Sequence, residues 1–128
     1  MLPVLSGIQM SPVASEHGVL ENPTKSPYSF EKYDSRWELE HMKRLEKDPT
    51  VAKWTKKHSI RIPYVDDMGF RKTFEPDFLV EMINGNKEIH EVKGTQFMNR
   101  ETQLKVNAAK RFCEQRKMVF RLISKIQI

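Results

Sequence analysis

The sequence predicts an α/β domain in which a small mixed β-sheet is flanked by helices. Two stretches, residues 35–47 and 100–115, repeat their apolar side chains at helical spacing, and shorter stretches alternate as strands do. The resulting order is helix, three strands, helix, strand, which is typical of a sheet with helices packed against it. A length of 128 residues with 38% hydrophobic content suits one such domain.

The composition argues against membrane and disulfide-rich classes. The chain has 30% charged residues and no apolar run of the ~18 residues that span a bilayer. The run at residues 1–5 is too short for a signal peptide. Cys113 is the single cysteine, so it has no internal partner for a disulfide. We therefore expect an intracellular, cytoplasmic protein with no membrane partner.

The positive charge is concentrated in the last third of the chain. Residues 1–86 carry 12 Lys and Arg against 13 Asp and Glu, whereas residues 87–128 carry 10 against 4. A basic segment beside a nearly neutral remainder favours a polyanionic partner.

The prolines divide the chain into an arm and a domain. Residues 1–32 show no sustained period and contain four of the seven prolines: Pro3, Pro12, Pro23 and Pro27. We predict an N-terminal arm over residues 1–32 and a single domain over residues 33–128.

The first helix has a clear start and a clear end. Ser35 followed by Glu38 is a capping-box pattern, and Asp48-Pro49 breaks the helix after Lys47. The remaining expected elements are a short helical turn over residues 51–57, strands over residues 59–65, 71–83 and 88–93, a helix over residues 100–115 and a strand over residues 118–124.

Glu38 lies where a carboxylate is not expected. On a helical wheel it falls near the centre of the apolar arc, so it faces the interior, where an unpaired carboxylate is costly. Two interpretations stay open. Glu38 either completes the capping box with Ser35 or belongs to a functional site.

The hairpin gathers further charged residues. A three-residue loop at residues 84–86 sets a register that places Asp77 opposite Lys93 and Leu79 opposite Glu91. Asp77, Glu91 and Lys93 then converge on one face of adjacent strands. A two-residue loop would scatter them, because a slip of one residue moves side chains to the other face.

Two carboxylates beside a lysine suit a hard divalent cation such as Mg²⁺. Asp77 and Glu91 are the expected metal ligands, joined by the carbonyl of Val92, and Glu38 acts through a water or on a second ion. Lys93 orients or helps to deprotonate a water, or stabilises charge on a phosphate. The implied chemistry is phosphodiester hydrolysis. The alternative is an ordinary cross-strand salt bridge.

These residues resemble a known family. Pro76-Asp77 followed by Glu91-Val92-Lys93 resembles the signature of the PD-(D/E)xK nuclease superfamily. The resemblance covers residues 33–124 and is greatest to TnsA-type transposon endonucleases and related phage nucleases; the nuclease domains of type III restriction enzymes are similar. The supporting segments, in the expected order, are Asp34 to Glu38, Ile62 to Tyr64, Phe74 to Val80, His90 to Gly94 and Lys105 to Ala109.

The resemblance implies a restriction-endonuclease-like core and Mg²⁺-dependent DNA cleavage, with Mn²⁺ as a substitute. Asp77, Glu91 and Lys93 match the motif, Glu38 matches the acid of the first helix, and Lys105 lies where such nucleases place a residue near the phosphates. TnsA-type enzymes also have a DNA-binding domain and a partner transposase. Because this chain ends soon after the last core strand, we expect a nuclease without that domain, encoded by a phage or a mobile element and, if by a phage, located in the host cytoplasm.

Basic residues around the second long helix are candidate DNA contacts, since phosphate contacts position DNA without reading its sequence. A solvated helix face is the alternative for most of them. The whole chain also has an alternative function, a non-catalytic DNA-binding or assembly module that retains the nuclease fold. A homodimer and a partner recombination or packaging protein both stay open. The expected DNA contacts are Lys105, Arg100, Arg111 and Arg116.

Overall fold

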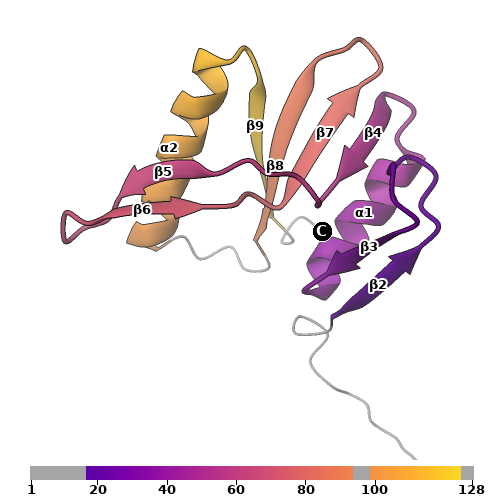
Figure 1. Ribbon diagram of the computed structural model, residues 1–128, viewed down its shortest axis with the longest axis horizontal. Coiled ribbons are helices and arrows are strands. Elements are labelled where there is room, and N and C mark those ends of the chain that lie inside the picture. The colour runs from indigo at the N-terminus through magenta and orange to yellow at the C-terminus, as the bar shows by residue number, and fades with distance from the viewer. Residues whose placement is uncertain (1–16, 94–98, 125–128) are drawn as a thin grey trace, which may run out of the picture.

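The computed structural model describes residues 17–93 and 99–124. Residues 1–16 of the predicted arm, Gly94 of the motif and the last four residues lie outside this part. The described residues form eight strands in three sheets, together with two helices (Figure 1). Neither helix is long and apolar enough to cross a membrane.

A four-stranded mixed sheet forms the centre of the molecule, in the order β4-β7-β8-β9. β8 pairs with β7 in the antiparallel sense and with β9 in the parallel sense. The predicted α/β class with a small mixed sheet and flanking helices is confirmed. The strands are β4 (Val51–Thr55), β7 (Phe78–Met82), β8 (Lys87–Lys93) and β9 (Val119–Ser124), and the helices are α1 (Arg36–Lys47) and α2 (Arg100–Gln115).

The two helices pack against different sides of this sheet. Met42 and Leu45 of α1 form one buried cluster with Phe78 and Val80 of β7. A second cluster joins Ala108, Ala109 and Cys113 of α2 to Ile89 of β8. Phe78 pairs with His90 in the sheet, whereas Leu79 pairs with Ile89, so the two clusters occupy opposite faces.

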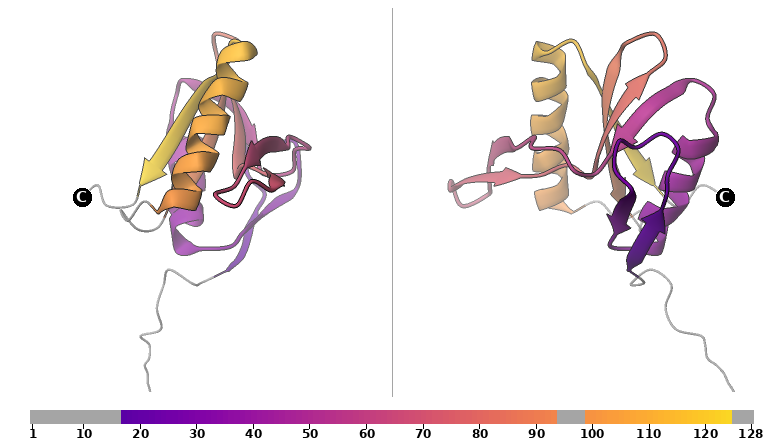
Figure 2. Two further views of the ribbon diagram at one scale, coloured as in Figure 1. Left: turned by 90° about the vertical axis from the view of Figure 1, so that its left-hand side faces the viewer. Right: turned by 45° about the vertical axis from the view of Figure 1, so that its right-hand side comes forward.

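Two hairpins complete the fold. β2 (Gly18–Glu21) pairs with β3 (Phe30–Tyr33), and β5 (Ile62–Val65) pairs with β6 (Arg71–Phe74). The β5–β6 hairpin extends from the central sheet past α2 in two different views (Figures 1 and 2).

The β2–β3 hairpin lies in the segment for which the sequence predicts only an irregular arm. Glu31 of β3 is fully buried and accepts hydrogen bonds from Ser26 Oγ, Thr55 Oγ1 and the amide of Lys56. A buried carboxylate therefore ties this hairpin to the end of β4, in addition to the packing of Leu20 and Tyr33 against the core. Hydrophobic periodicity does not reveal a polar anchor of this kind.

The expected helical turn over residues 51–57 is wrong, because this segment is the strand β4. Val51 and Trp54 are both buried, and the pairing with β7 is irregular between Val51 and Lys53. A bulge inserts one residue and disturbs the alternation of side chains. The three-residue spacing of the buried side chains therefore imitates a helix.

The single strand expected over residues 71–83 is also wrong. β6 ends at Phe74 and β7 begins at Phe78, and the two strands belong to different sheets. Pro76 is buried in the break between them and has no amide hydrogen to donate to a strand partner. The break places Asp77 immediately before a central strand.

The hairpin register differs from the expected one by two residues. Leu79 pairs with Ile89 rather than with Glu91, and the amide of Met82 donates to the carbonyl of Asn86 at 2.8 Å. The loop keeps three residues but begins one residue earlier. A shift of two residues leaves every side chain on its predicted face.

Candidate active site

The break before β7 and the end of β8 bring two carboxylates together. The amide of Asp77 donates to Oε1 of Glu91 at 3.0 Å, and the amide of Val92 donates to Oδ2 of Asp77 at 2.8 Å. Each carboxylate thus accepts a hydrogen bond from a backbone amide at or next to the other acidic residue. The structure thereby brings Asp77 and Glu91 together as the sequence predicts, with Asp77 opposite Glu91 rather than opposite Lys93.

Both carboxylates are difficult to ionise. Burial, with the neighbouring charge of Glu38, raises the pKa of Asp77 to about 6. Burial and the charge of Asp77 raise the pKa of Glu91 to about 7. Lys56 and Lys93 act on Asp77 in the opposite direction but do not overcome these effects. Added positive charge at this point is therefore favourable.

Glu38 enters the same site from the first turn of α1. Ser35 caps the helix by accepting the Glu38 amide at 3.2 Å, while Glu38 Oε1 accepts the Asp34 amide at 2.9 Å. Glu38 is buried, and its charge also acts on Asp77. Glu38 therefore completes the helix cap and also lies near the carboxylate pair. The sequence alone presents these two roles as alternatives.

Lys56 is a site residue that the sequence reasoning missed. Its ammonium group forms an ion pair with Glu38 and a longer one, at 3.4 Å, with Asp34, and its side chain is only 15% exposed. Its charge lowers the pKa of Asp77. The sequence signal for Lys56 is its position directly after residues 51–55. This position indicates a site at a strand end only when residues 51–55 are recognised as the strand β4.

Two further lysines, Lys93 of β8 and Lys105 of α2, lie close to Glu91. Together with Glu91 they line a small cavity between β8 and α2. The ammonium group of Lys105 lies 5.7 Å from the ring centroid of Phe74 and 5.9 Å from that of Tyr64. Its charge also lowers the pKa of Glu91. The structure thus places Lys105, which the sequence resemblance expects near the phosphates, beside Glu91.

The donor set fits a hard divalent cation. Among the described residues, the amide hydrogen bonds engage Oδ2 of Asp77 and Oε1 of Glu91 and leave Oδ1 and Oε2 for other ligands. Among residues 17–93 and 99–124, no three His, Cys, Asp or Glu side chains are arranged to hold one ion. Mg²⁺ commonly binds through one or two carboxylates and completes its shell with waters and substrate phosphates.

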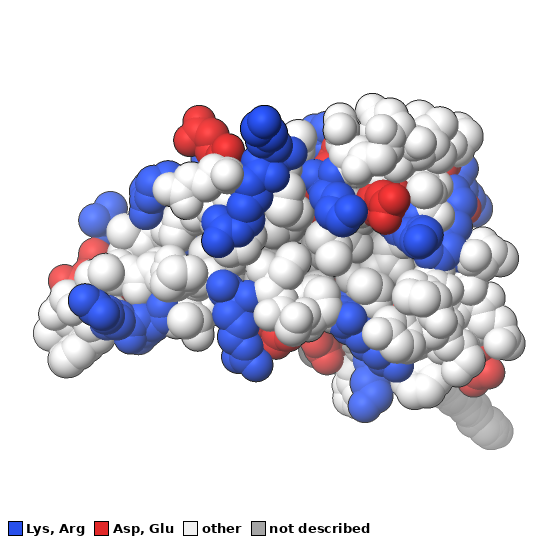
Figure 3. All heavy atoms as spheres, turned by 45° about the horizontal axis from the view of Figure 1, so that its top comes forward, with Lys and Arg blue, Asp and Glu red and all other residues white. Residues whose placement is uncertain are grey.

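The three expected arginine contacts lie on α2 or just beyond it, and all are exposed. Arg100 forms an ion pair with Asp67 at 2.8 Å. Arg116 stacks on the ring of Phe112 at 3.6 Å from its centroid, and Arg111 borders a groove beside α2. In the space-filling view of Figure 3, Lys and Arg side chains are spread over the visible face, with fewer acidic ones among them.

The mixed sheet with paired carboxylates and lysines at its strand ends has the architecture of the nuclease class that the sequence motif indicates. The family model for the TnsA-like endonuclease N-terminal domain matches residues 48–125, which is more than half of the chain. The chain belongs to this family, and the predicted resemblance is confirmed. The match includes Asp77, Glu91, Lys93 and Lys105, whereas Glu38 precedes it. No curated protein shows significant similarity to the chain.

Proposed function

We propose that this protein is a metal-dependent DNA endonuclease that hydrolyses phosphodiester bonds. The observation that supports this most directly is the adjacent pair of Asp77 and Glu91, whose ionisation is suppressed until a cation or another positive group compensates their charge. Membership of the endonuclease family agrees with this chemistry. The lysines around the pair supply groups that bind phosphate.

Asp77 and Glu91 would hold Mg²⁺ or Mn²⁺, with the carbonyl of Val92 as a further oxygen donor. The bound ion would polarise the scissile phosphate and lower the pKa of a bound water. Holding the ion at two carboxylates leaves room for the substrate, because Mg²⁺ retains several exchangeable positions.

The lysines have distinct proposed roles. Lys93 adjoins Glu91 in the same cavity, where its ammonium group orients a water or stabilises charge that develops on the phosphate. Lys56 neutralises Glu38 and helps to keep Asp77 ionised. Lys56 is therefore a positioning residue, and Lys105 is a contact to the phosphate beside the cut.

The test is cleavage of supercoiled plasmid and of branched DNA with Mg²⁺, with Mn²⁺ or with a chelator. Wild-type protein is compared with Asp77→Asn, Lys93→Ala and the control Lys110→Ala, whose residue is exposed on α2. We expect metal-dependent nicking by wild type and control, and none by the two site variants.

Two results would contradict the proposal in different ways. Equal nicking by all four proteins would mean a contaminating nuclease or a misplaced site. A folded wild-type protein that binds DNA but does not cut either substrate with either metal would favour the non-catalytic binding module.

A further inference from the structure

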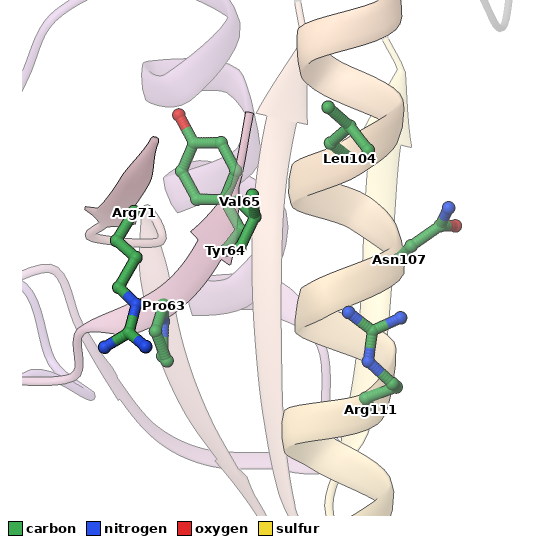
Figure 4. Close-up of a pocket in the computed structure, with 7 residues that line it drawn as sticks. All are labelled: Pro63, Tyr64, Val65, Arg71, Leu104, Asn107 and Arg111. Atoms are coloured by element: carbon green, nitrogen blue, oxygen red, sulfur yellow. The ribbon is translucent and has the colours of Figure 1, made fainter. Parts of the chain in front are cut away.

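A groove separates the β5–β6 hairpin from α2. It consists of two adjoining cavities of about 430 Å³ and about 260 Å³, which share Pro63 and Arg111. Figure 4 shows the larger one, with Arg71 on the hairpin side and Arg111 extending from α2 on the other side. The groove is distinct from the cavity that Glu91 lines.

The lining of this groove is strongly basic. Four arginines border it, and no Asp or Glu does: Arg61, Arg71, Arg111 and Arg116. Exposed guanidinium groups that converge on one groove repel each other, and they suit a ligand with several negative charges.

These arginines differ from others in the chain. Within the part of the chain that the structure describes, Arg61, Arg71 and Arg111 form no ion pair. Arg100 and Arg121, in contrast, are paired with nearby carboxylates at 2.8 Å. These three guanidinium groups therefore remain available for an external anion, whereas Arg116 donates a hydrogen bond to the carbonyl of Phe112 and stacks on its ring.

The hairpin wall of the groove is held in shape by its turn. Asp66 Oδ1 accepts the amides of Met68 and Phe70, each at 2.9 Å, and Oδ2 forms an ion pair with Lys72 at 3.1 Å. The same hydrogen bonds and Lys72 lower the pKa of Asp66, which keeps the carboxylate ionised. A preorganised wall reduces the entropy lost when a ligand binds.

The groove begins beside the candidate active site. Tyr64 lines the groove, and the ammonium group of Lys105 lies over its ring. Along α2 the groove runs from Leu104 to Gln115, which is about 16 Å at 1.5 Å per residue. A DNA backbone winds around the helix axis, so its phosphates are spaced more widely along the strand than the axial rise of about 3.4 Å per nucleotide. A groove of this length therefore accommodates a few consecutive phosphates of one strand.

We propose that this arginine groove binds the sugar–phosphate backbone of DNA on one side of the scissile bond. Arg71 and Arg111 contact phosphates from opposite walls, and Asn107, which also lines the groove, is a further donor. This inference rests on the proposed function, since it assigns the path of that substrate. It adds Arg61 and Arg71 to the predicted contacts. It does not involve Arg100, which lies outside the groove and pairs with Asp67.

The experiment measures DNA binding apart from cleavage. Fluorescence anisotropy with a labelled 20-base-pair duplex, and with the corresponding single strand, is recorded in chelator between 50 and 300 mM salt. The Arg71→Gln/Arg111→Gln variant is compared with wild type and with Lys43→Gln/Arg44→Gln, which removes the same charge from the exposed side of α1. Thermal melting by circular dichroism establishes that all three proteins are folded.

We expect the groove variant to bind at least tenfold more weakly, with a log–log salt slope smaller by about 2, because each lost phosphate contact lowers it by about 1. The control should bind within threefold of wild type. The duplex and single-strand arms then show which form the groove accepts.

Equal weakening in both double variants would overturn the proposal, because it would mean that only the overall charge matters. Unchanged binding by the groove variant would overturn it as well. Plasmid cleavage by wild type remains a separate readout. A protein that cleaves but shows no groove effect would refute the groove while leaving the endonuclease function intact.

Discussion

Two glutamates on the same strand have opposite ionisation behaviour. Glu88 and Glu91 lie three residues apart on β8, and burial alone acts to raise the pKa of both. The pKa of Glu88 is nevertheless lowered by hydrogen bonds from Arg121 and His90, each at 2.8 Å. The pKa of Glu91 is raised to about 7 because its neighbour is another carboxylate, Asp77. The neighbouring group, rather than burial, therefore determines which of the two carboxylates lacks a compensating positive partner.

The Glu88 side of the strand is a hydrogen-bonded network that includes both buried histidines. His90 Nε2 contacts Glu88, and its Nδ1 lies 2.8 Å from His41 Nε2 of α1. Burial is the largest cause that lowers the pKa of both histidines, that of His41 to about 3, and it thereby favours their neutral forms. Among the buried side-chain nitrogen and oxygen atoms in the described part of the chain, only His41 Nδ1 has no hydrogen-bond partner. This side therefore connects α1 to the sheet, while the Asp77 and Glu91 pair remains open to a ligand.

The largest expected effect comes from neutralising the open pair. Asp77→Asn and Glu91→Gln should each reduce cleavage by at least 100-fold, because each removes a proposed metal ligand. Neither should lower the melting temperature in chelator, since each substitution relieves repulsion between buried carboxylates. Plasmid nicking rates and circular dichroism melting measure the two effects. A variant that loses activity only because it unfolds would show that the pair is structural.

The second effect is a dependence of stability on pH. Folding raises the pKa of both carboxylates, so their stabilising contribution is complete below the ordinary values and is lost as the pH rises through about 6 and 7. Between pH 5 and 8, metal-free wild type should lose on the order of 4 kcal/mol relative to Asp77→Asn/Glu91→Gln, at ~1.4 kcal/mol per pKa unit. Urea unfolding of both proteins measures this difference.

Comparison with the double variant isolates the pair. Glu88, His41 and His90 also have shifted pKa values, but they are unchanged in the variant, so their contributions cancel. Added Mg²⁺ should restore wild-type stability at pH 8 and leave the variant unaffected. A parallel pH dependence of the two proteins would contradict the assignment of the raised pKa values.

The third prediction concerns Glu88, whose replacement should reduce stability but leave cleavage unchanged. Glu88→Gln should destabilise the fold by about 2 kcal/mol, because Arg121 and His90 lose a charged acceptor. Cleavage per folded molecule should stay at the wild-type level, since Glu88 faces α1 rather than the candidate site. Urea unfolding and plasmid nicking provide both measurements. A loss of cleavage in a folded Glu88→Gln protein would mean that the two sides of β8 are coupled.

The features that the sequence predicted are those fixed by neighbours along the chain. The Ser35 cap and the bounds of α2 follow from local signals, and the structure agrees with both. The predicted convergence of Asp77 and Glu91 on one face holds despite an error of two residues in the register, because a shift by an even number of residues leaves every side chain on its face. The carboxylate pair could therefore be predicted without the correct register.

The features that the sequence did not reveal depend on contacts between distant segments. Lys56 joins the site only because β4 ends beside α1, and the bulge in β4 concealed that strand. Glu31 anchors the β2–β3 hairpin through Thr55 and Lys56, about 25 residues away. Periodicity reports the burial of apolar residues, so it does not detect buried polar anchors of this kind.

The smallest effect separates the two roles of Glu38. Ser35→Ala removes the acceptor for the Glu38 amide and should cost about 1 kcal/mol, as N-cap replacements do. Cleavage should be unchanged, because Glu38 Oε1 still accepts the Asp34 amide and still pairs with Lys56. Glu38→Gln preserves the shape of the side chain but removes the charge that faces Lys56 and Asp77, so it should lower cleavage with a similarly small change in stability. Equal cleavage by both variants would mean that Glu38 is only a cap, and the carboxylate pair would then act without a third acid.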